Sequence, residues 1–175
     1  KMILIADSGS TKTTWFYSGV TIGNELITTQ GINPFFRTAD NIILELKESL
    51  VPQLKGQVEQ IFFYGAGIIN KEKANVVSLA LNRLFPDSEV EVQSDLIAAA
   101  RATLGNEPGI ACILGTGCNS GLYNGSEITA HVPPLGFILG DEGSGAVLGR
   151  KLLADFLKGI MPENLSRQFK KQYPF

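Results

Sequence analysis

Residues 2–17 read MILIADSGSTKTTWFY, and this stretch decides the fold. An apolar run at residues 2–6 ends at Asp7 and is followed by a short turn of serine and glycine. Residues 13–17 are again β-branched and aromatic, and a third run of this kind follows another turn at residues 26–29. Short β-rich runs separated by turn residues predict an antiparallel meander of three strands.

Beyond residue 40 the apolar residues follow a helical period and alternate with further β-rich runs. The predicted elements are a helix carrying Ile43, Leu46 and Leu50, a strand at 58–64, a helix carrying Ala74, Val77, Leu81 and Leu84, a strand at 89–93 and an alanine-rich helix at 95–104. Three antiparallel strands followed by alternating helices and strands predict an α/β protein with the ribonuclease H-like fold. In that fold, which actin-like ATPases share, helices flank a mixed five-stranded sheet.

A glycine-rich segment at residues 105–109 is the best candidate for a domain boundary. The opening pattern then returns, with β-rich runs at 110–114, 120–123 and 128–132 and helical patterns at about 143–157 and at 163–171. We therefore expect a duplicated fold, with one lobe at 1–107 and the start of a second lobe at 108–175. The second lobe lacks the later strand–helix units of the first, so we expect it to be incomplete and the natural chain to continue.

The composition argues against several classes of partner. The 175 residues are 44% hydrophobic and 18% charged, with a net charge of −2, as in ordinary globular domains. Because no basic stripe is present, we expect no binding to nucleic acid or to an acidic membrane surface. The longest apolar runs are too short to cross a bilayer. Cys112 and Cys118 alone give poor support for a disulfide framework, so we expect a reduced, cytoplasmic setting.

The first segment that can carry chemistry is the polar turn after the first strand. Glycine and small hydroxyl residues allow backbone N–H groups to surround a phosphate, and an acidic residue beside them can orient Mg²⁺ through its water shell. The turn is not a Walker A loop, because Thr11 stands where glycine should precede Lys12. A plain polar hairpin is the alternative. The candidate phosphate ligands are Asp7, Ser8, Gly9, Ser10, Thr11, Lys12 and Thr13, with Asp7 also the candidate for Mg²⁺.

A second glycine-rich turn, Gly115-Thr116-Gly117, stands at the equivalent place in the second copy. It is not a dinucleotide-binding fingerprint, because the third glycine, Gly121, comes one residue late and a strand follows. In a duplicated fold the two turns are expected to face each other across a cleft. Two sets of backbone N–H groups on opposite walls could then hold a polyphosphate.

Two acidic segments complete the candidate site. Asp95 follows a strand and opens the alanine-rich helix, so it or Ser94 could be a helix cap. It also lies at the carboxyl edge of the sheet, where ligands bind in open α/β folds, and could accept a proton from an attacking alcohol. Asp141 and Glu142 are predicted to open the next helix, where the helix dipole favours acidic residues. Their alternative role is to bind sugar hydroxyls.

Taken in order, the segments 7–13, 94–95, 114–120 and 140–144 resemble the BadF/BadG/BcrA/BcrD ATPase family, in particular its N-acetylglucosamine kinase branch. The resemblance implies an ATP-dependent kinase that uses Mg²⁺, with the two glycine-rich turns as phosphate loops. It implies that Asp95 is the base that activates the sugar hydroxyl. It also implies sugar contacts from Asn33, Asp95, Thr116, Gly136, Asp141 and Glu142, with Thr116 near both ligands.

Two other functions are compatible with the same family. One is an ATP-driven activator that passes electrons through an iron–sulfur cluster, which needs cysteine thiolates as ligands. Cys112 lies in a predicted core strand and Cys118 in a predicted phosphate loop, so neither cysteine is well placed to be such a ligand. The other is a non-catalytic nucleotide or sugar sensor. His131 is expected to be an ordinary strand residue. The expected ligands are the sugar and ATP, and a homodimer is the one protein assembly that we expect could form.

Overall fold

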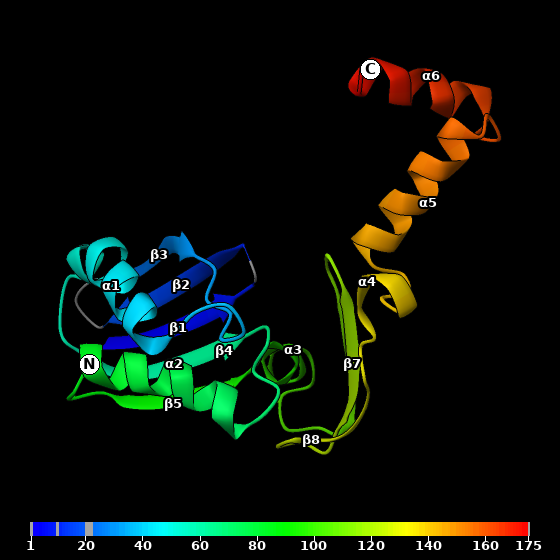
Figure 1. The fold of residues 1–175 in the computed structure, drawn as a ribbon. Helices are drawn as coiled ribbons and strands as arrows, with labels where there is room; N and C mark the ends of the chain where they lie inside the picture. The colour runs from blue at the N-terminus through cyan, green and yellow to red at the C-terminus, as the bar shows by residue number, and fades with distance from the viewer. Residues whose placement is uncertain (1, 10, 20–22, 175) are drawn as a thin grey trace. The chain divides into compact units, whose positions relative to one another are not determined.

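The computed structural model describes residues 2–9, 11–19 and 23–174. The chain forms two compact units, Lys1–Ala102 and Thr103–Phe175 (Figure 1). Each unit has a sheet and helices of its own, and the candidate residues are divided between them. The first unit contains the first hairpin and Asp95, and the second contains the second glycine-rich turn and Asp141.

The first unit contains a five-stranded mixed sheet in the strand order β3-β2-β1-β4-β5. The β1–β2 and β2–β3 pairs are antiparallel, whereas β4 pairs in parallel with both β1 and β5. The predicted ribonuclease H-like fold is confirmed. Its elements are β1 (Met2–Ser8), β2 (Lys12–Gly19), β3 (Gly23–Gln30), α1 (Ala39–Ser49), the 3₁₀ turn η1 (Val51–Gln53), β4 (Val58–Gly65), α2 (Lys71–Leu84), β5 (Glu89–Ser94) and α3 (Asp95–Leu104).

The core lies between one face of this sheet and the helices α1 and α2. Alternate residues of β1 point into it, and burying such side chains supplies most of the favourable free energy of folding. Trp15 of β2, the chain's single tryptophan, is fully buried. Its indole N–H donates to Thr29 Oγ1 at 2.9 Å, and its ring centroid lies 6.0 Å from that of Phe63. The polar atom of a large apolar residue is thereby satisfied inside the core.

The opposite face of the sheet carries Asp7 in β1 and, beside it in the parallel register, Tyr64 in β4. Arg101 of α3 lies against this face. Its Nη1 donates to Tyr64 Oη at 2.7 Å and to Glu91 Oε1 at 2.8 Å. The helix that begins with Asp95 is thus held to β4 and β5 by the charge-assisted hydrogen bonds of Arg101.

The second unit begins with three antiparallel strands in the order β6-β7-β8. The middle strand in sequence is also the middle strand in space, as in the meander of β1, β2 and β3. The returning β-rich pattern therefore forms the same local topology. The elements of this unit are β6 (Gly109–Leu114), β7 (Cys118–Tyr123), β8 (Ile128–Val132), α4 (Gly136–Leu139), α5 (Gly145–Leu157) and α6 (Glu163–Gln172).

Two expectations for the second unit were wrong. The helix predicted at about 143–157 is present as α5, Gly145–Leu157, but the acidic pair does not open it, because Ser144 is its N-cap and accepts from the Val147 N–H at 3.2 Å. Asp141 and Glu142 lie in the turn before it, so the helix dipole does not explain them. Cys112, expected in the core, is exposed in β6, because the residues of that strand that point into the unit are its neighbours.

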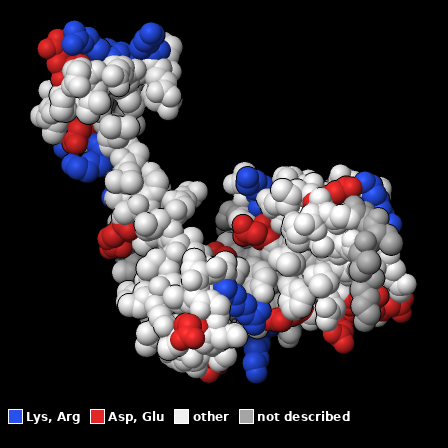
Figure 2. All heavy atoms as spheres, turned by 180° about the vertical axis from the view of Figure 1, so that it is seen from behind, with Lys and Arg blue, Asp and Glu red and all other residues white. Residues whose placement is uncertain are grey.

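The surface agrees with an ordinary globular chain. On the face shown in Figure 2, acidic and basic side chains are interspersed. Within the described residues, no helix is both long and apolar enough to cross a membrane.

Candidate functional site

Three strand ends of the first unit lie side by side at one edge of its sheet. The register aligns Ser8 at the end of β1 with Gly65 of β4, and Gly65 with Ser94 of β5. The first hairpin, the turn after β4 and the start of α3 therefore meet at the carboxyl edge of the parallel strands. This edge is where open α/β sheets bind ligands.

The hairpin between β1 and β2 has an exposed tip and a buried base. The Gly9 N–H donates to the Lys12 carbonyl oxygen at 2.9 Å and closes the turn. The side chains of Asp7, Thr11 and Lys12 are exposed, so they are available to a ligand. Ser10, also a candidate phosphate ligand, lies outside the described residues.

The base of the hairpin is closed by Ser8 and Thr13, which are fully buried. Their hydroxyl oxygens lie 2.7 Å apart and are hydrogen-bonded to each other. Ser8 Oγ also accepts from the Ile32 N–H at 3.0 Å. Both residues were predicted as phosphate ligands, and the structure places their hydroxyls inside the first unit.

Asp95 is the first residue of α3, and its carboxylate oxygen Oδ1 accepts from the Leu96 N–H at 2.9 Å. The capping contact to the helix interior comes from Ser94, whose Oγ accepts from the Ile97 N–H at 3.4 Å. Burial raises the pKa of the Asp95 carboxyl, and the negative charge of Asp7 raises it further. A carboxylate with a raised pKa is a stronger proton acceptor, as a general base requires.

Asn33 lies in the turn that joins β3 to α1. Its side-chain Oδ1 accepts from the Phe35 N–H at 2.9 Å, and its carbonyl oxygen accepts from the Phe36 N–H at 3.0 Å. These two hydrogen bonds form an Asn-Pro turn, in which the asparagine side chain accepts from the backbone two residues further on. Within the described residues Asn33 Nδ2 has no hydrogen-bond partner, so its two N–H donors are free to bind a ligand.

Gly67 permits this position of Asn33. A Cβ atom at residue 67 would lie 2.6 Å from Asn33 Oδ1, and the backbone of Gly67 has a φ of +82°. Both the space and the backbone angle favour glycine there. The turn after β4 thus supports the loop that carries the candidate sugar ligand.

The turn between β6 and β7 is closed by the Gly115 N–H, which donates to the Gly117 carbonyl oxygen at 2.9 Å. Thr116 at its tip is exposed. The start of α5 holds this turn through two backbone hydrogen bonds, from the Gly145 N–H to the Gly115 oxygen at 2.8 Å and from the Ala146 N–H to the Thr116 oxygen at 3.2 Å.

Asp141 is a structural part of the same turn. Its side chain is buried, and Oδ1 accepts from the Cys118 N–H at 3.1 Å. Its backbone is in the left-handed region, with a φ of 62°. Gly117 leaves the space for this carboxylate, because a Cβ there would lie 3.0 Å from Asp141 Oδ1.

The two other candidate sugar ligands in this unit differ from Asp141 in exposure. Glu142, the next residue, is exposed, and Gly136 begins α4 with a φ of 74°. Burial raises the pKa of the Cys118 thiol, and the nearby carboxylates of Asp141 and Glu142 raise it further. This thiol is therefore held in its protonated form.

The donor set suits Mg²⁺ held mainly by water and phosphate. Within the described residues, no group of three or more histidine, cysteine, aspartate or glutamate side chains could hold a metal ion directly. Mg²⁺ usually keeps several waters and binds one or two carboxylates together with substrate phosphates. Asp7 has an exposed carboxylate beside the hairpin tip and fits that role.

Sequence reasoning missed the buried Ser8–Thr13 pair and the role of Asp141. A signal for the first was available, because Ser8 continues the inward series of Met2, Leu4 and Ala6 in β1. Strand alternation alone therefore turns its hydroxyl into the core. The hydrogen bond of Asp141 joins residues 23 positions apart and left no local signal.

Comparison with solved structures supports the fold. A provisionally assigned N-acetylglucosamine kinase from Porphyromonas gingivalis is 45% identical, with a TM-score of 0.87. The similarity covers 98% of this chain and 62% of that protein, so the chain spans less than two thirds of the relative's length. No protein-family profile matches the sequence, and no curated protein matches it.

More distant structures share the fold alone. A provisionally assigned N-acetylglucosamine kinase from Chromobacterium violaceum is 17% identical, with a TM-score of 0.64 over 99% of this chain and 64% of that protein. MamK, in a non-polymerising mutant bound to AMPPNP, is 12% identical, with a TM-score of 0.63 over 100% of this chain and 66% of its own. The architecture is therefore that of the actin-like ATPases.

Proposed function

We propose that this chain belongs to an ATP-dependent sugar kinase that phosphorylates an amino sugar, N-acetylglucosamine, at a hydroxyl group. The observation that carries the proposal is the position of Asp95. It is a carboxylate of raised pKa at the carboxyl edge of the sheet, near Asp7 and the first hairpin. The 45% identity to a provisionally assigned N-acetylglucosamine kinase supports the choice of substrate class.

In the proposed reaction Asp95 accepts the proton of the attacking sugar hydroxyl. The hydroxyl oxygen forms a bond to the γ-phosphorus of ATP as the bond from that phosphorus to the β–γ bridging oxygen breaks, which gives ADP and a sugar phosphate. Such a transfer needs mainly positioning and charge neutralisation from the protein. Mg²⁺ would supply part of that neutralisation, with Asp7 orienting its bound water.

The remaining candidate ligands take the roles expected from the sequence. We assign phosphate binding to the tips of the two glycine-rich turns, where Thr11, Lys12 and Thr116 are exposed. Asn33 Nδ2 would donate to a sugar hydroxyl or carbonyl oxygen. Gly136, Asp141 and Glu142 are proposed sugar contacts in the second unit, and Asp141 Oδ2 is the oxygen that its bond to Cys118 leaves available.

The test is ADP production by the full-length protein, measured across a panel of sugars with and without N-acetylglucosamine. Asp95→Asn should keep the fold and lower sugar-dependent turnover by about 10²- to 10⁴-fold, the usual contribution of a general base. Asp40→Asn is the matched control, because this exposed carboxylate of α1 forms an ion pair with Arg83 at the surface. Its turnover should equal that of the unmodified protein.

Two outcomes would contradict the proposal. If Asp95→Asn keeps most of its turnover, Asp95 is not the base. If the protein binds ATP but no sugar increases ADP production, it is a sensor rather than a kinase.

A further inference from the structure

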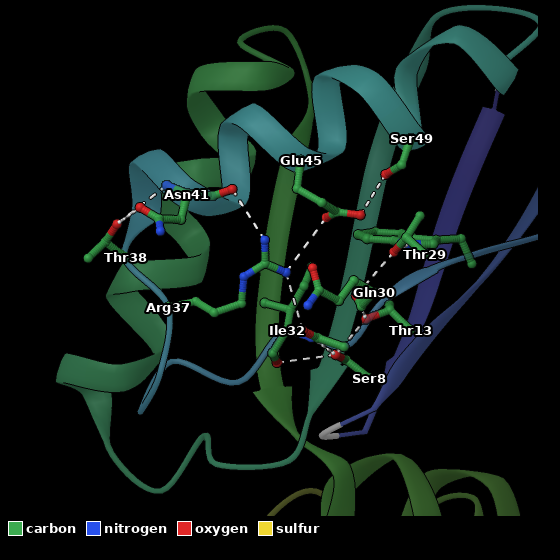
Figure 3. A network of polar contacts seen from close by, with 12 residues as sticks. Ser8, Thr13, Thr29, Gln30, Ile32, Arg37, Thr38, Asn41, Glu45 and Ser49 are labelled. Atoms are coloured by element: carbon green, nitrogen blue, oxygen red, sulfur yellow. Dashed lines mark hydrogen bonds and ion pairs between the residues drawn. The ribbon is translucent and has the colours of Figure 1, made fainter.

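The last residue of β3 and the two residues after it are hydrogen-bonded to the first hairpin, and Figure 3 shows the contacts of Gln30 and Ile32 with Thr13 and Ser8. Thr13 Oγ1 donates to the Gln30 carbonyl oxygen at 3.1 Å. The Gly31 N–H donates to the Thr11 carbonyl oxygen at 3.1 Å, and the Ile32 N–H donates to Ser8 Oγ at 3.0 Å. The chain therefore enters the Asn33 turn in a position set by the hairpin.

The buried hydroxyls of Ser8 and Thr13, called here the hydroxyl pair, share two protons. Thr13 Oγ1 can donate to the Gln30 carbonyl oxygen, and Ser8 Oγ can donate either to Thr13 Oγ1 at 2.7 Å or to the Ile32 carbonyl oxygen at 3.2 Å. In both arrangements Ser8 Oγ also accepts from the Ile32 N–H, so the hydroxyl pair joins the hairpin to residues 30 and 32. The buried hydroxyls therefore find their hydrogen-bond partners within the first unit.

The other side of the same segment is held by α1. Arg37 Nη1 donates to the Gly31 carbonyl oxygen at 3.2 Å, and Nη2 donates to the Asn41 carbonyl oxygen at 3.2 Å. Glu45 Oε2 lies 3.7 Å from Arg37 Nη1, and its other oxygen accepts from Ser49 Oγ at 2.7 Å. Arg37 thus holds the carbonyl of a residue whose N–H is bonded to the hairpin.

We propose that Ser8 and Thr13 are positioning residues. The hydroxyl pair sets the position of Asn33, the candidate sugar ligand, relative to the phosphate-binding tip of the first hairpin. Both hydroxyls are fully buried and their hydrogen bonds are already made, so in the folded unit they do not reach a phosphate. The structural part of the proposal stands on these contacts, and its kinetic part rests on the proposed kinase function.

The structural part is tested by amide hydrogen exchange of Ser8→Ala, followed by NMR. The Ile32 amide should exchange about tenfold faster, because Ser8→Ala removes Ser8 Oγ, the oxygen that accepts its N–H. Ala66 is the internal control, because its N–H donates to the backbone oxygen of Ser8 at 2.8 Å, which the substitution keeps. An unchanged Ile32 rate, or an equal rise at Ala66, would overturn the proposal.

The kinetic part is tested with Thr13→Val, which removes the hydroxyl but keeps the shape. The KM for the sugar should rise about tenfold, equivalent to roughly one lost hydrogen bond, and Thr13→Ser should restore it. Tyr17→Phe is the matched control, because Tyr17 lies in β2 like Thr13 but away from the Asn33 turn. The substitution removes the hydrogen bond that Tyr17 Oη donates to Glu25 Oε2 at 2.6 Å. Its KM should not change.

The two failures are distinguishable. A KM that moves equally in Thr13→Val and Tyr17→Phe, or in neither, refutes positioning by the hydroxyl pair. A protein without sugar-dependent ADP production refutes the kinase function, and the exchange of Ile32 and Ala66 then still decides the structural part.

Discussion

The two glycine-rich hairpins share a backbone plan but are held in different ways. At the base of the first, Ser8 pairs with Thr13, and their side chains join it to the Asn33 turn. At the base of the second, Leu114 pairs with Cys118, and the hairpin is held by the Asp141 carboxylate and by backbone bonds from α5. One topology can thus position a loop through neutral hydroxyls in one copy and through a carboxylate in the other.

The largest effect should come from the carboxylate that holds the second hairpin. Asp141→Ala should cost about 2 kcal/mol of unfolding free energy, because it leaves the Cys118 N–H without its charged acceptor. Glu142→Ala is the matched control, since that neighbouring carboxylate is exposed and should change stability by less than about 0.5 kcal/mol. Denaturant unfolding followed by circular dichroism measures both. Equal losses in the two variants would show that the hydrogen bond contributes nothing.

A smaller effect should come from the equivalent positions at the two hairpin bases. Thr13→Val should cost about 1.5 kcal/mol, because it breaks the hydroxyl pair inside the first unit. Cys118→Ala should cost about 0.5 kcal/mol, since its thiol is only half-buried and its N–H keeps the bond to Asp141. Thermal unfolding of the two variants checks this order. If Cys118→Ala were the more harmful, the distinction between the hairpins would fail.

The smallest effect concerns the Asp95 carboxylate. Its removal should raise stability, whereas removal of the Asp141 carboxylate should lower it. Asp95→Asn should raise the unfolding free energy at neutral pH by less than about 1 kcal/mol, because it removes a negative charge that burial and the nearby charge of Asp7 disfavour. The folded-state pKa of Asp95 lies above its unfolded value, so the folded state holds more protons between those two values. Stability of the unmodified protein therefore falls as pH rises through that interval.

The pH dependence separates this effect from other causes. Below the ordinary carboxyl pKa, Asp95 is protonated in both states, and the unmodified protein and Asp95→Asn should be equally stable. Unfolding free energies measured from acid to neutral pH provide the comparison. A constant difference at every pH would show that Asp95 ionisation is not responsible.

The sequence was most informative where short β-rich runs are separated by turn residues. The apolar run of β1 and the β-branched and aromatic run of β2 were enough to predict the sheet, and in the structure burial alternates along both strands. The helix α1 ends at Ser49, shortly before Pro52, and α2 ends at Leu84, shortly before Pro86, because proline disfavours the continuation of a helix. These features are local, so single-sequence reasoning finds them.

Candidate ligands were harder to predict, because the same polar side chain can bind a ligand where it is exposed and stabilises the fold where it is buried. Ser8 and Thr13 belong to a glycine-rich turn that resembles a phosphate loop, yet strand alternation turns their hydroxyls inward. Asp141 adopts a left-handed backbone whose carboxylate reaches the distant Cys118 N–H, a contact that no local pattern encodes. The residue types in the site were predictable, whereas the direction in which each side chain points depended on tertiary contacts.

The single tryptophan has a practical consequence for all of these measurements. Trp15 lies in the core of the first unit, and the second unit contains no tryptophan. Its intrinsic fluorescence therefore reports the melting of one unit selectively, whereas circular dichroism averages over both. Midpoints from the two signals that disagree would reveal two separate unfolding transitions, and each hairpin variant could then be assigned to the transition that it shifts.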